Sequence, residues 1–225
     1  DARVRWHYRS TFGFWWEVDN PFVGNRSCDP ITGGLVVGNV YDGNTGEGLT
    51  AADRESRYGE IADYLPNSQA DGRRVGLPSD DSQLAFWTLE SLLDRGSLDP
   101  DDLSARFASR QIFGLGHAVA TFLSNRAEGV TSWYRCGAES AGNGALMRIA
   151  PIVLLHPAGT SAALWLDSAL ASIVTHRDAS SVASCVAFTD LLARLLRMQA
   201  PPQPGWMIAT FVATVRRVCT DQSYR

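Results

Sequence analysis

Residues 76 to 95 read GLPSDDSQLAFWTLESLLDR, and this stretch decides the fold of the chain. After its polar start the apolar residues recur at helical spacing, which predicts a helix that runs to Arg95. Ser79, Asp80 and Asp81 therefore lie at the helix N-terminus. Acids there are ordinary caps, because they accept bonds from unpaired backbone donors and oppose the positive end of the helix dipole. The same hydroxyl and carboxylates are hard oxygen ligands that suit Mg²⁺, so a metal site is the alternative interpretation.

The composition is that of a globular protein with a sizeable core: 225 residues, of which 45% are hydrophobic and 10% aromatic. A net charge of −4 gives no basic footprint for nucleic acid. No membrane span and no signal-peptide pattern is visible, so we expect no membrane partner. The four cysteines are far apart and form no CxxC pair, which predicts reduced thiols in a cytoplasmic protein and no zinc site: Cys28, Cys136, Cys185 and Cys219.

The chain is predicted to have two parts, an arm over residues 1–30 and a helical domain over residues 31–225. The first 20 residues are rich in Trp, Tyr and Phe without clean periodicity, and turn-forming pairs follow them. We interpret the arm as packed on the domain through its rings, in preference to a separate binding surface. Residues 31 to 41 fit either a strand or a closely packed helix, since periodicity does not separate the two.

Helical patterns dominate the rest of the sequence, which predicts an all-α domain. Asp99, followed by Pro100 and two further acids, has the pattern of a helix start, and we interpret Asp99, Asp101 and Asp102 as capping charges. A glycine-containing segment at 112–116 leads into another helix through Leu123. The later helices are predicted over residues 161–174, 181–198 and 206–218.

Two polar connections stand out among these helices. Ser140-Ala141-Gly142-Asn143-Gly144 runs directly into a predicted helix over residues 145–151. Backbone amides on such a turn can hold an anion such as phosphate, although a plain loop and cap explains the pattern equally well. The second connection is the elbow at residues 175–178. A histidine at a helix end, such as His176, is usually a cap or a surface group.

The order of these blocks resembles the ADP-ribosylglycohydrolase family, which includes the dinitrogenase-reductase-activating glycohydrolases and the ADP-ribosyl-acceptor hydrolases. The resemblance rests on residues 79–83, 112–116, 140–151 and 174–176, and it covers the chain from about residue 31 onward. It implies an orthogonal bundle of α-helices with two Mg²⁺ ions in a cleft. The implied activity is hydrolysis of the bond between ribose C1″ of ADP-ribose and a modified acceptor. The expected partners are an ADP-ribosylated protein or small molecule, with nucleic acid only as a modified acceptor.

The resemblance also implies roles for particular residues. Ser79, Asp80 and Asp81 match the family's metal-binding Thr-Asp-Asp triplet, and Asp80 and Asp81 would be essential to catalysis. Glu47 would be the carboxylate that activates water or assists the leaving group, with Asp42 as its rival. Arg148 is expected to anchor its turn. The residues implied in substrate binding are Gly114, Gly116, Ser140, Gly142, Asn143, Gly144 and His176.

The chain departs from the family pattern in two places. Gly38-Asn39 stands where the family has Gly-Asp, and Glu47 reaches the position of the family's Glu only with an insertion of one residue. The Asp-x-Asp-Thr motif that completes the family's metal site is not found after His176. We therefore expect the bundle to be incomplete at its C-terminal end. The alternative function is a non-catalytic ADP-ribose-binding or interaction protein with an incomplete metal site.

Overall fold

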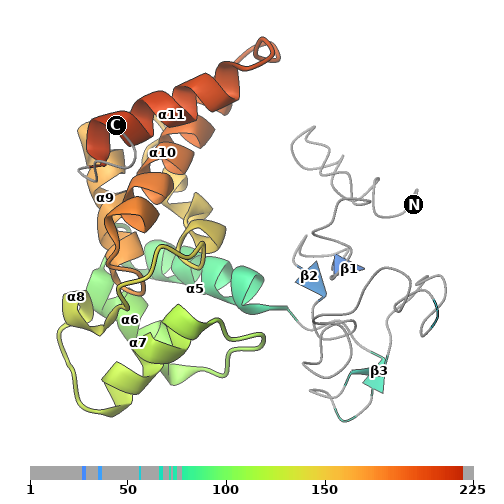
Figure 1. Ribbon diagram of the computed structural model, residues 1–225, viewed down its shortest axis with the longest axis vertical. Helices are drawn as coiled ribbons and strands as arrows, with labels where there is room; N and C mark the ends of the chain where they lie inside the picture. Colours follow the sequence, from blue (N-terminus) through green and yellow to red (C-terminus); the bar gives the residue numbers. More distant parts are fainter. Residues whose placement is uncertain are drawn as a thin grey trace. The chain divides into compact units, whose positions relative to one another are not determined.

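The stretch at residues 76–95 forms helix α5, Asp80–Arg95, and the predicted helix is confirmed (Figure 1). Its inner face carries Leu84, Trp87 and Leu92, which are all buried. Phe86 and Leu93, the sequence neighbours of two of these, are exposed by 45% and 74%. The helical period is therefore visible in the sequence, but the choice within each apolar pair was made by packing.

The computed structural model describes residues 78–219 continuously and, before them, residues 27–28, 35–36, 56, 66–67, 71 and 73–74. These residues fall into two compact units. One contains the described residues up to Gln83 together with Gln111–Leu115, and the other contains Leu84–Arg110 with the chain from Gly116 onward. The predicted boundary at residue 30 falls outside the described residues and stays a prediction.

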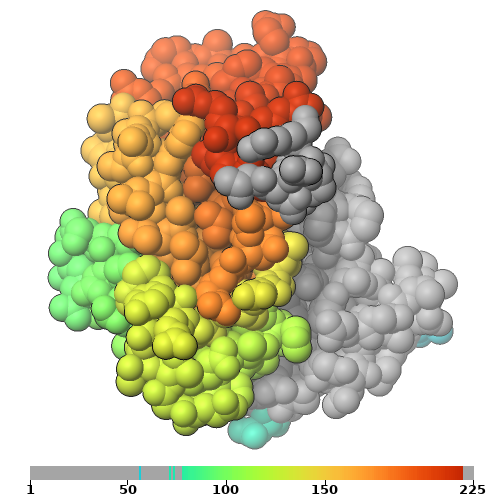
Figure 2. Space-filling model, turned by 60° about the vertical axis from the view of Figure 1, so that its left-hand side comes forward, coloured from blue at the N-terminus to red at the C-terminus, as the bar shows by residue number. Residues whose placement is uncertain are grey.

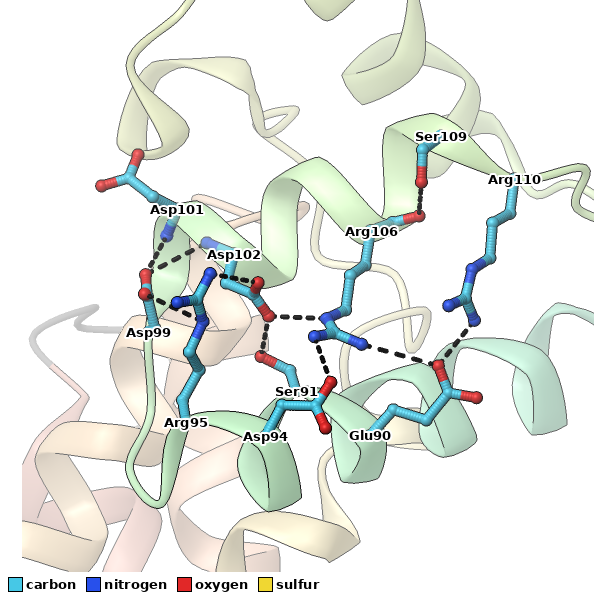
Figure 3. Close-up of polar contacts among 10 residues, drawn as sticks. All are labelled: Glu90, Ser91, Asp94, Arg95, Asp99, Asp101, Asp102, Arg106, Ser109 and Arg110. Atoms are coloured by element: carbon cyan, nitrogen blue, oxygen red, sulfur yellow. Dashed lines mark hydrogen bonds and ion pairs between the residues drawn. The ribbon is translucent and has the colours of Figure 1, made fainter.

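Helix α6, Pro100–Ser109, begins as its sequence predicts. Asp99 is the N-cap, and its carboxylate accepts hydrogen bonds from the amides of Asp101 and Asp102 at 3.1 and 3.0 Å. Asp101 and Asp102 are acids of the first turn, as predicted, and Asp102 has a second role that the sequence did not reveal. Its side chain is only 10% exposed and joins α6 to α5 through hydrogen bonds with Ser91 and Arg95, and it also accepts a bond from Arg106 one turn later in α6 (Figure 3).

The remaining α-helices of the second unit lie close to the predicted ranges. They are α7 His117–Ala127, α8 Trp133–Cys136, α9 Ala162–Ile173, α10 Ala179–Leu195 and α11 Trp206–Val218. Ser161 caps α9 and Asp178 caps α10, each by accepting bonds from backbone amides of the first turn. Before α11, Gly205 has φ +79, a left-handed conformation that glycine adopts without steric cost.

Helix α10 packs between α9 and α11, and Figure 2 shows the three helices together in golden orange to red. Between α10 and α11 lie Ala183, Ala187, Val215 and Cys219, with Phe211 and Val218 packed against them. The alanines allow the two helices to approach closely. Asp190 of α10 is fully buried. Its carboxylate accepts hydrogen bonds from Trp165 Nε1 of α9 at 2.9 Å and from Thr214 Oγ1 of α11 at 3.2 Å. A third bond, at 2.8 Å, comes from Arg194 Nε within α10. One carboxylate thus joins all three helices.

The prediction of a regular α-helix over residues 145–151 is wrong. The chain there forms two short 3₁₀ segments, η2 Leu146–Arg148 and η3 Ala150–Leu155. Pro151 has no amide hydrogen to give to an α-helix, and it disfavours helical dihedrals at the residue before it. A regular helix through this segment would lose at least one hydrogen bond.

The all-α class is confirmed. The described strands have two residues each and form two antiparallel pairs, β1 Ser27–Cys28 with β2 Leu35–Val36 and β3 Pro66–Asn67 with β4 Arg73–Arg74. Within residues 31–41, the described pair Leu35–Val36 is therefore a strand. No helix among the described residues is long and apolar enough to cross a membrane.

Candidate functional site

The Ser79–Asp81 triplet lies at the start of α5, as predicted. Ser79 and Asp80 are 1% and 8% exposed. The Ser79 carbonyl accepts the first helical hydrogen bond, from the amide of Gln83 at 2.9 Å, and its hydroxyl donates to Asp81 Oδ2 at 3.1 Å. The triplet thus serves as a helix start and also keeps a hydroxyl and a carboxylate oxygen side by side.

Gln83 joins this triplet to the loop at Gln111–Leu115. Its Nε2 donates to the carbonyl of Gln111 at 2.9 Å, and its Oε1 accepts the amide of Phe113 at 2.8 Å. The amide of Asp80 donates to the carbonyl of Phe113 at 2.7 Å. The structure therefore brings the predicted blocks at 79–83 and 112–114 together, and Gln83 is a residue whose role the sequence pattern did not reveal.

Gly114 follows in this loop with φ +74, a conformation that residues with a Cβ rarely adopt. Glycine is therefore needed there for the turn itself. A role for Gly114 near the substrate stays a prediction.

The donor set of the triplet fits a hard divalent cation. Hydroxyl and carboxylate oxygens are the ligands that Mg²⁺ accepts, and two of them already lie 3.1 Å apart. Across residues 78–219 and the short segments described before them, no group of three or more His, Cys, Asp or Glu side chains is placed to hold a metal ion.

In the second unit, the segment before the Ser140–Gly144 loop is bonded to the elbow at residues 175–177. Ala138 forms a parallel bridge with His176, in which the Ala138 amide donates to the Thr175 carbonyl at 2.9 Å and the Arg177 amide donates to the Ala138 carbonyl at 2.8 Å. A Cβ on Gly137 would lie 2.5 Å from the carbonyl oxygen of Ile173. Glycine is required here for close backbone approach, and nothing in the local sequence indicated it.

The Ser140–Gly144 loop packs directly on the imidazole of His176. A Cβ on Gly144 would lie 2.8 Å from Cε1 and 3.0 Å from Nε2 of His176, so only glycine fits. Ser181 Oγ, from the first turn of α10, donates to the carbonyl of Gly142 at 3.3 Å and holds the loop on the other side. Ser140, Gly142, Gly144 and His176 are thus brought together by the structure.

The interpretation of His176 as a cap or surface group is wrong, because its side chain is 1% exposed. Burial lowers the pKa of His176 to about 4, and the positive charge of Arg148 adds to this effect. The imidazole is therefore neutral at neutral pH. The burial of His176 could not be predicted from the sequence alone, because the residues that cover its side chain come from 30 to 40 positions away.

Arg148 lies fully buried behind the elbow. Its Nη2 donates to the carbonyl of Ala171 at 2.9 Å and to Thr175 Oγ1 at 2.7 Å, and its guanidinium carbon lies 4.9 Å from the centre of the Phe107 ring. Burial lowers the pKa of Arg148 to about 10, which still leaves it charged at neutral pH. Nε and Nη1 have no hydrogen-bond partner among the described residues, and the guanidinium lies over the aromatic face of Phe107.

The argument for an anion at a helix N-terminus needs correction, because η2 is a three-residue 3₁₀ segment and carries no sizeable dipole. The amide of Gly142 is also occupied, since it donates to Ser140 Oγ at 3.2 Å. The amides of Asn143 and Gly144 donate to no group in the described part of the chain. These two amides, in an exposed to half-exposed loop, are available to a ligand.

The site residues predicted from the sequence are distributed over both units. Ser79, Asp80, Asp81 and Gly114 belong to the first unit. Gly116, which immediately precedes α7, belongs to the second, together with Ser140, Gly142, Asn143, Gly144 and His176. Glu47 and its rival Asp42 lie outside the described residues.

The fold and these residues define a class: an all-α protein with an acidic triplet at one helix start and a glycine-rich loop packed on a buried histidine. Residues 34–224 match the family model described as ADP-ribosylglycohydrolase. The chain therefore belongs to the ADP-ribosylglycohydrolase family.

A relative of the chain is an uncharacterized protein of Archaeoglobus fulgidus. It is 29% identical over 164 residues, which cover 71% of this chain and 52% of the relative. The chain thus spans about half the length of this curated relative.

Proposed function

We propose that the protein is a hydrolase that releases ADP-ribose from an ADP-ribosylated acceptor by cleaving the glycosidic bond at ribose C1″. Membership of the ADP-ribosylglycohydrolase family supports the substrate class. The structural observation that carries the proposal is the contact of the Ser140–Gly144 loop with a buried, neutral His176. This contact forms a polar surface with hydrogen-bond donors, which suits a diphosphate.

The proposed substrate contacts follow from the available donors. The amides of Asn143 and Gly144 would bind diphosphate oxygens, as amides in consecutive loop positions bind anions. Ser140 would orient the loop through its bond with the Gly142 amide, and His176 would close the pocket. Gly114 and Gly116 would allow close approach of the backbone to the distal ribose and diphosphate.

Ser79, Asp80 and Asp81 would hold Mg²⁺, of which the family pattern implies two ions. When bound, the metal would orient the ribose hydroxyls and polarise a water molecule. Glu47 would take a proton from that water or assist the leaving group. Nearby carboxylates would stabilise the positive charge of an oxocarbenium-like transition state.

The metal role is tested by Asp80→Asn and Asp81→Asn, assayed for Mg²⁺-dependent release of ADP-ribose. We expect each to lose more activity than the roughly 10- to 100-fold that outer-shell substitutions cost at metal sites. Asp101→Asn is the matched control, because it removes one acid from the first turn of another helix. Unchanged turnover in Asp80→Asn or Asp81→Asn would rule out the metal assignment.

Calorimetry with ADP-ribose, with and without Mg²⁺, separates catalysis from binding alone. A hydrolase is expected to turn over substrate in the presence of metal. Tight, metal-independent binding by a wild-type protein that shows no turnover would instead identify a non-catalytic ADP-ribose-binding protein.

A further inference from the structure

Arg148, Thr175 and His176 form a buried chain of hydrogen bonds behind the Ser140–Gly144 loop. Arg148 Nη2 lies 2.7 Å from Thr175 Oγ1, and Thr175 Oγ1 lies 2.9 Å from His176 Nδ1. The three residues are 0%, 0% and 1% exposed. Water is therefore not available to replace a missing donor or acceptor along this chain.

The direction of each hydrogen bond follows from what each group can donate. Arginine has no acceptor, so Arg148 must donate to Thr175 Oγ1. The hydroxyl of Thr175 has a single proton, and its only other partner in the described residues is His176 Nδ1. If Nδ1 carried a proton, the Thr175 hydroxyl proton would be buried without an acceptor, which is costly. Thr175 therefore donates to Nδ1.

In a neutral imidazole one nitrogen accepts and the other donates. With Nδ1 accepting, the ring proton is on Nε2. This nitrogen has no hydrogen-bond partner among the described residues, and it faces Gly142 and Gly144 of the loop. Because Nδ1 is engaged with Thr175, the proton on Nε2 is the donor that the ring can offer to a ligand at this loop.

We propose that Thr175 and Arg148 are positioning residues that hold His176 as its neutral Nε2–H tautomer, which presents one hydrogen-bond donor to a ligand oxygen at the Ser140–Gly144 loop. The ligand class is an oxygen-rich group such as a phosphate or a ribose hydroxyl. The identity of the ligand as ADP-ribose rests on the proposed function. The tautomer itself does not.

The charges around His176 agree with a neutral ring. Burial and Arg148 disfavour protonation of His176, and Asp178 at the start of α10 favours it by less than either. Arg177 donates to the carbonyl of Gly137 and pairs with Glu139 at 3.5 Å. Cys185 of α10, which faces Arg148, has its thiol pKa raised by burial and stays uncharged.

Nuclear magnetic resonance of ¹⁵N-histidine-labelled protein tests the tautomer directly, because the two ring nitrogens differ in chemical shift when one is protonated. The His176 signals are assigned by their loss in His176→Gln. We expect a protonated Nε2 and an unprotonated Nδ1 in the wild type without any ligand. A proton on Nδ1, or a doubly protonated ring at neutral pH, would overturn the proposal.

The variants separate positioning from packing. Thr175→Val keeps the shape and removes the hydroxyl, so we expect a mixture of tautomers and an affinity for ADP-ribose about tenfold lower. Thr175→Ser restores the hydroxyl and should restore both readouts. Thr189→Val is the matched control, because Thr189 is equally buried and bonds to Ser168 Oγ at 2.7 Å, away from His176.

The outcomes distinguish the two proposals. A wild-type tautomer in Thr175→Val, or a tautomer change in Thr189→Val equal to that in Thr175→Val, would overturn the positioning role. If the tautomers behave as expected but the wild type does not bind ADP-ribose, the positioning role is supported and the proposed function is wrong.

Discussion

Gly144 has only a hydrogen atom where every other residue has a Cβ, and this leaves room for the imidazole of His176 in its present position. The imidazole cannot move away freely, because Thr175 holds Nδ1 on one side and the elbow is bonded to Ala138. The position therefore combines a steric requirement with a role in the proposed ligand site.

We expect Gly144→Ala to displace the loop or the ring, because its Cβ would lie 2.8 Å from His176 Cε1. The strain should cost about 1–3 kcal/mol of stability. The larger effect should be on ADP-ribose affinity, measured by calorimetry beside a thermal unfolding curve. Gly142→Ala is the milder comparison, since its Cβ would lie 3.2 Å from Ser140 Oγ and 3.8 Å from His176 Nε2. Equal affinity in Gly144→Ala and wild type would contradict the tight fit.

Among the elements, α5 and α6 are joined by an ion-pair network rather than by apolar residues alone (Figure 3). Asp102 accepts bonds from Ser91 Oγ at 2.6 Å, Arg95 Nη2 at 2.8 Å and Arg106 Nε at 2.6 Å. Arg106 also pairs with Asp94 at 2.7 Å. Burial would raise the pKa of Asp102, but the hydrogen bonds from Arg106, Ser91 and Arg95 outweigh it and hold that pKa well below its usual range.

Asp102→Asn should therefore destabilise the protein by about 2 kcal/mol, because it removes the charge and leaves donors of Arg95 and Arg106 poorly paired. Asp101→Asn makes the same change one residue earlier, at an exposed position, and should alter stability by less than about 0.5 kcal/mol. Urea unfolding of both variants measures the difference. Similar losses in both would show that the helix dipole, not the network, determines the effect.

At the scale of the whole molecule, buried titratable groups make stability depend on pH. His176 has a folded pKa of about 4, below its ordinary 6.5, so the unfolded chain binds a proton more readily. Its contribution is fully present above pH 6.5 and is lost as the pH falls toward 4. The folded pKa values of Asp102 and Asp190 are lowered, because hydrogen bonds to each outweigh burial, and their contributions are lost at still lower pH.

We expect the free energy of unfolding to fall between pH 6.5 and 4 by up to about 3 kcal/mol from His176. Urea unfolding across a pH series measures this slope. In His176→Gln the slope in this window should become smaller, whatever the stability of the variant at neutral pH. The same slope in both proteins would show that another group takes up the proton.

Local patterns determined much of the architecture. The helix at 206–218 has the predicted bounds, the α6 start has its predicted cap, and the acidic triplet begins α5. These features depend on residues three or four positions apart, on caps and on proline, so they are visible in the sequence. The order of the motif blocks also indicated the family to which the chain belongs.

Tertiary structure decided what these elements do together. Packing decided that Trp87 is buried rather than Phe86, and that position 137 needs glycine. It also formed the network at Asp102 and the hydrogen bonds that link Arg148 through Thr175 to His176. A sequence specifies the local turn of a helix through short-range hydrogen bonds and sterics. The burial and the hydrogen-bond partners of a side chain depend on segments distant in the sequence, which are fixed only when the core packs.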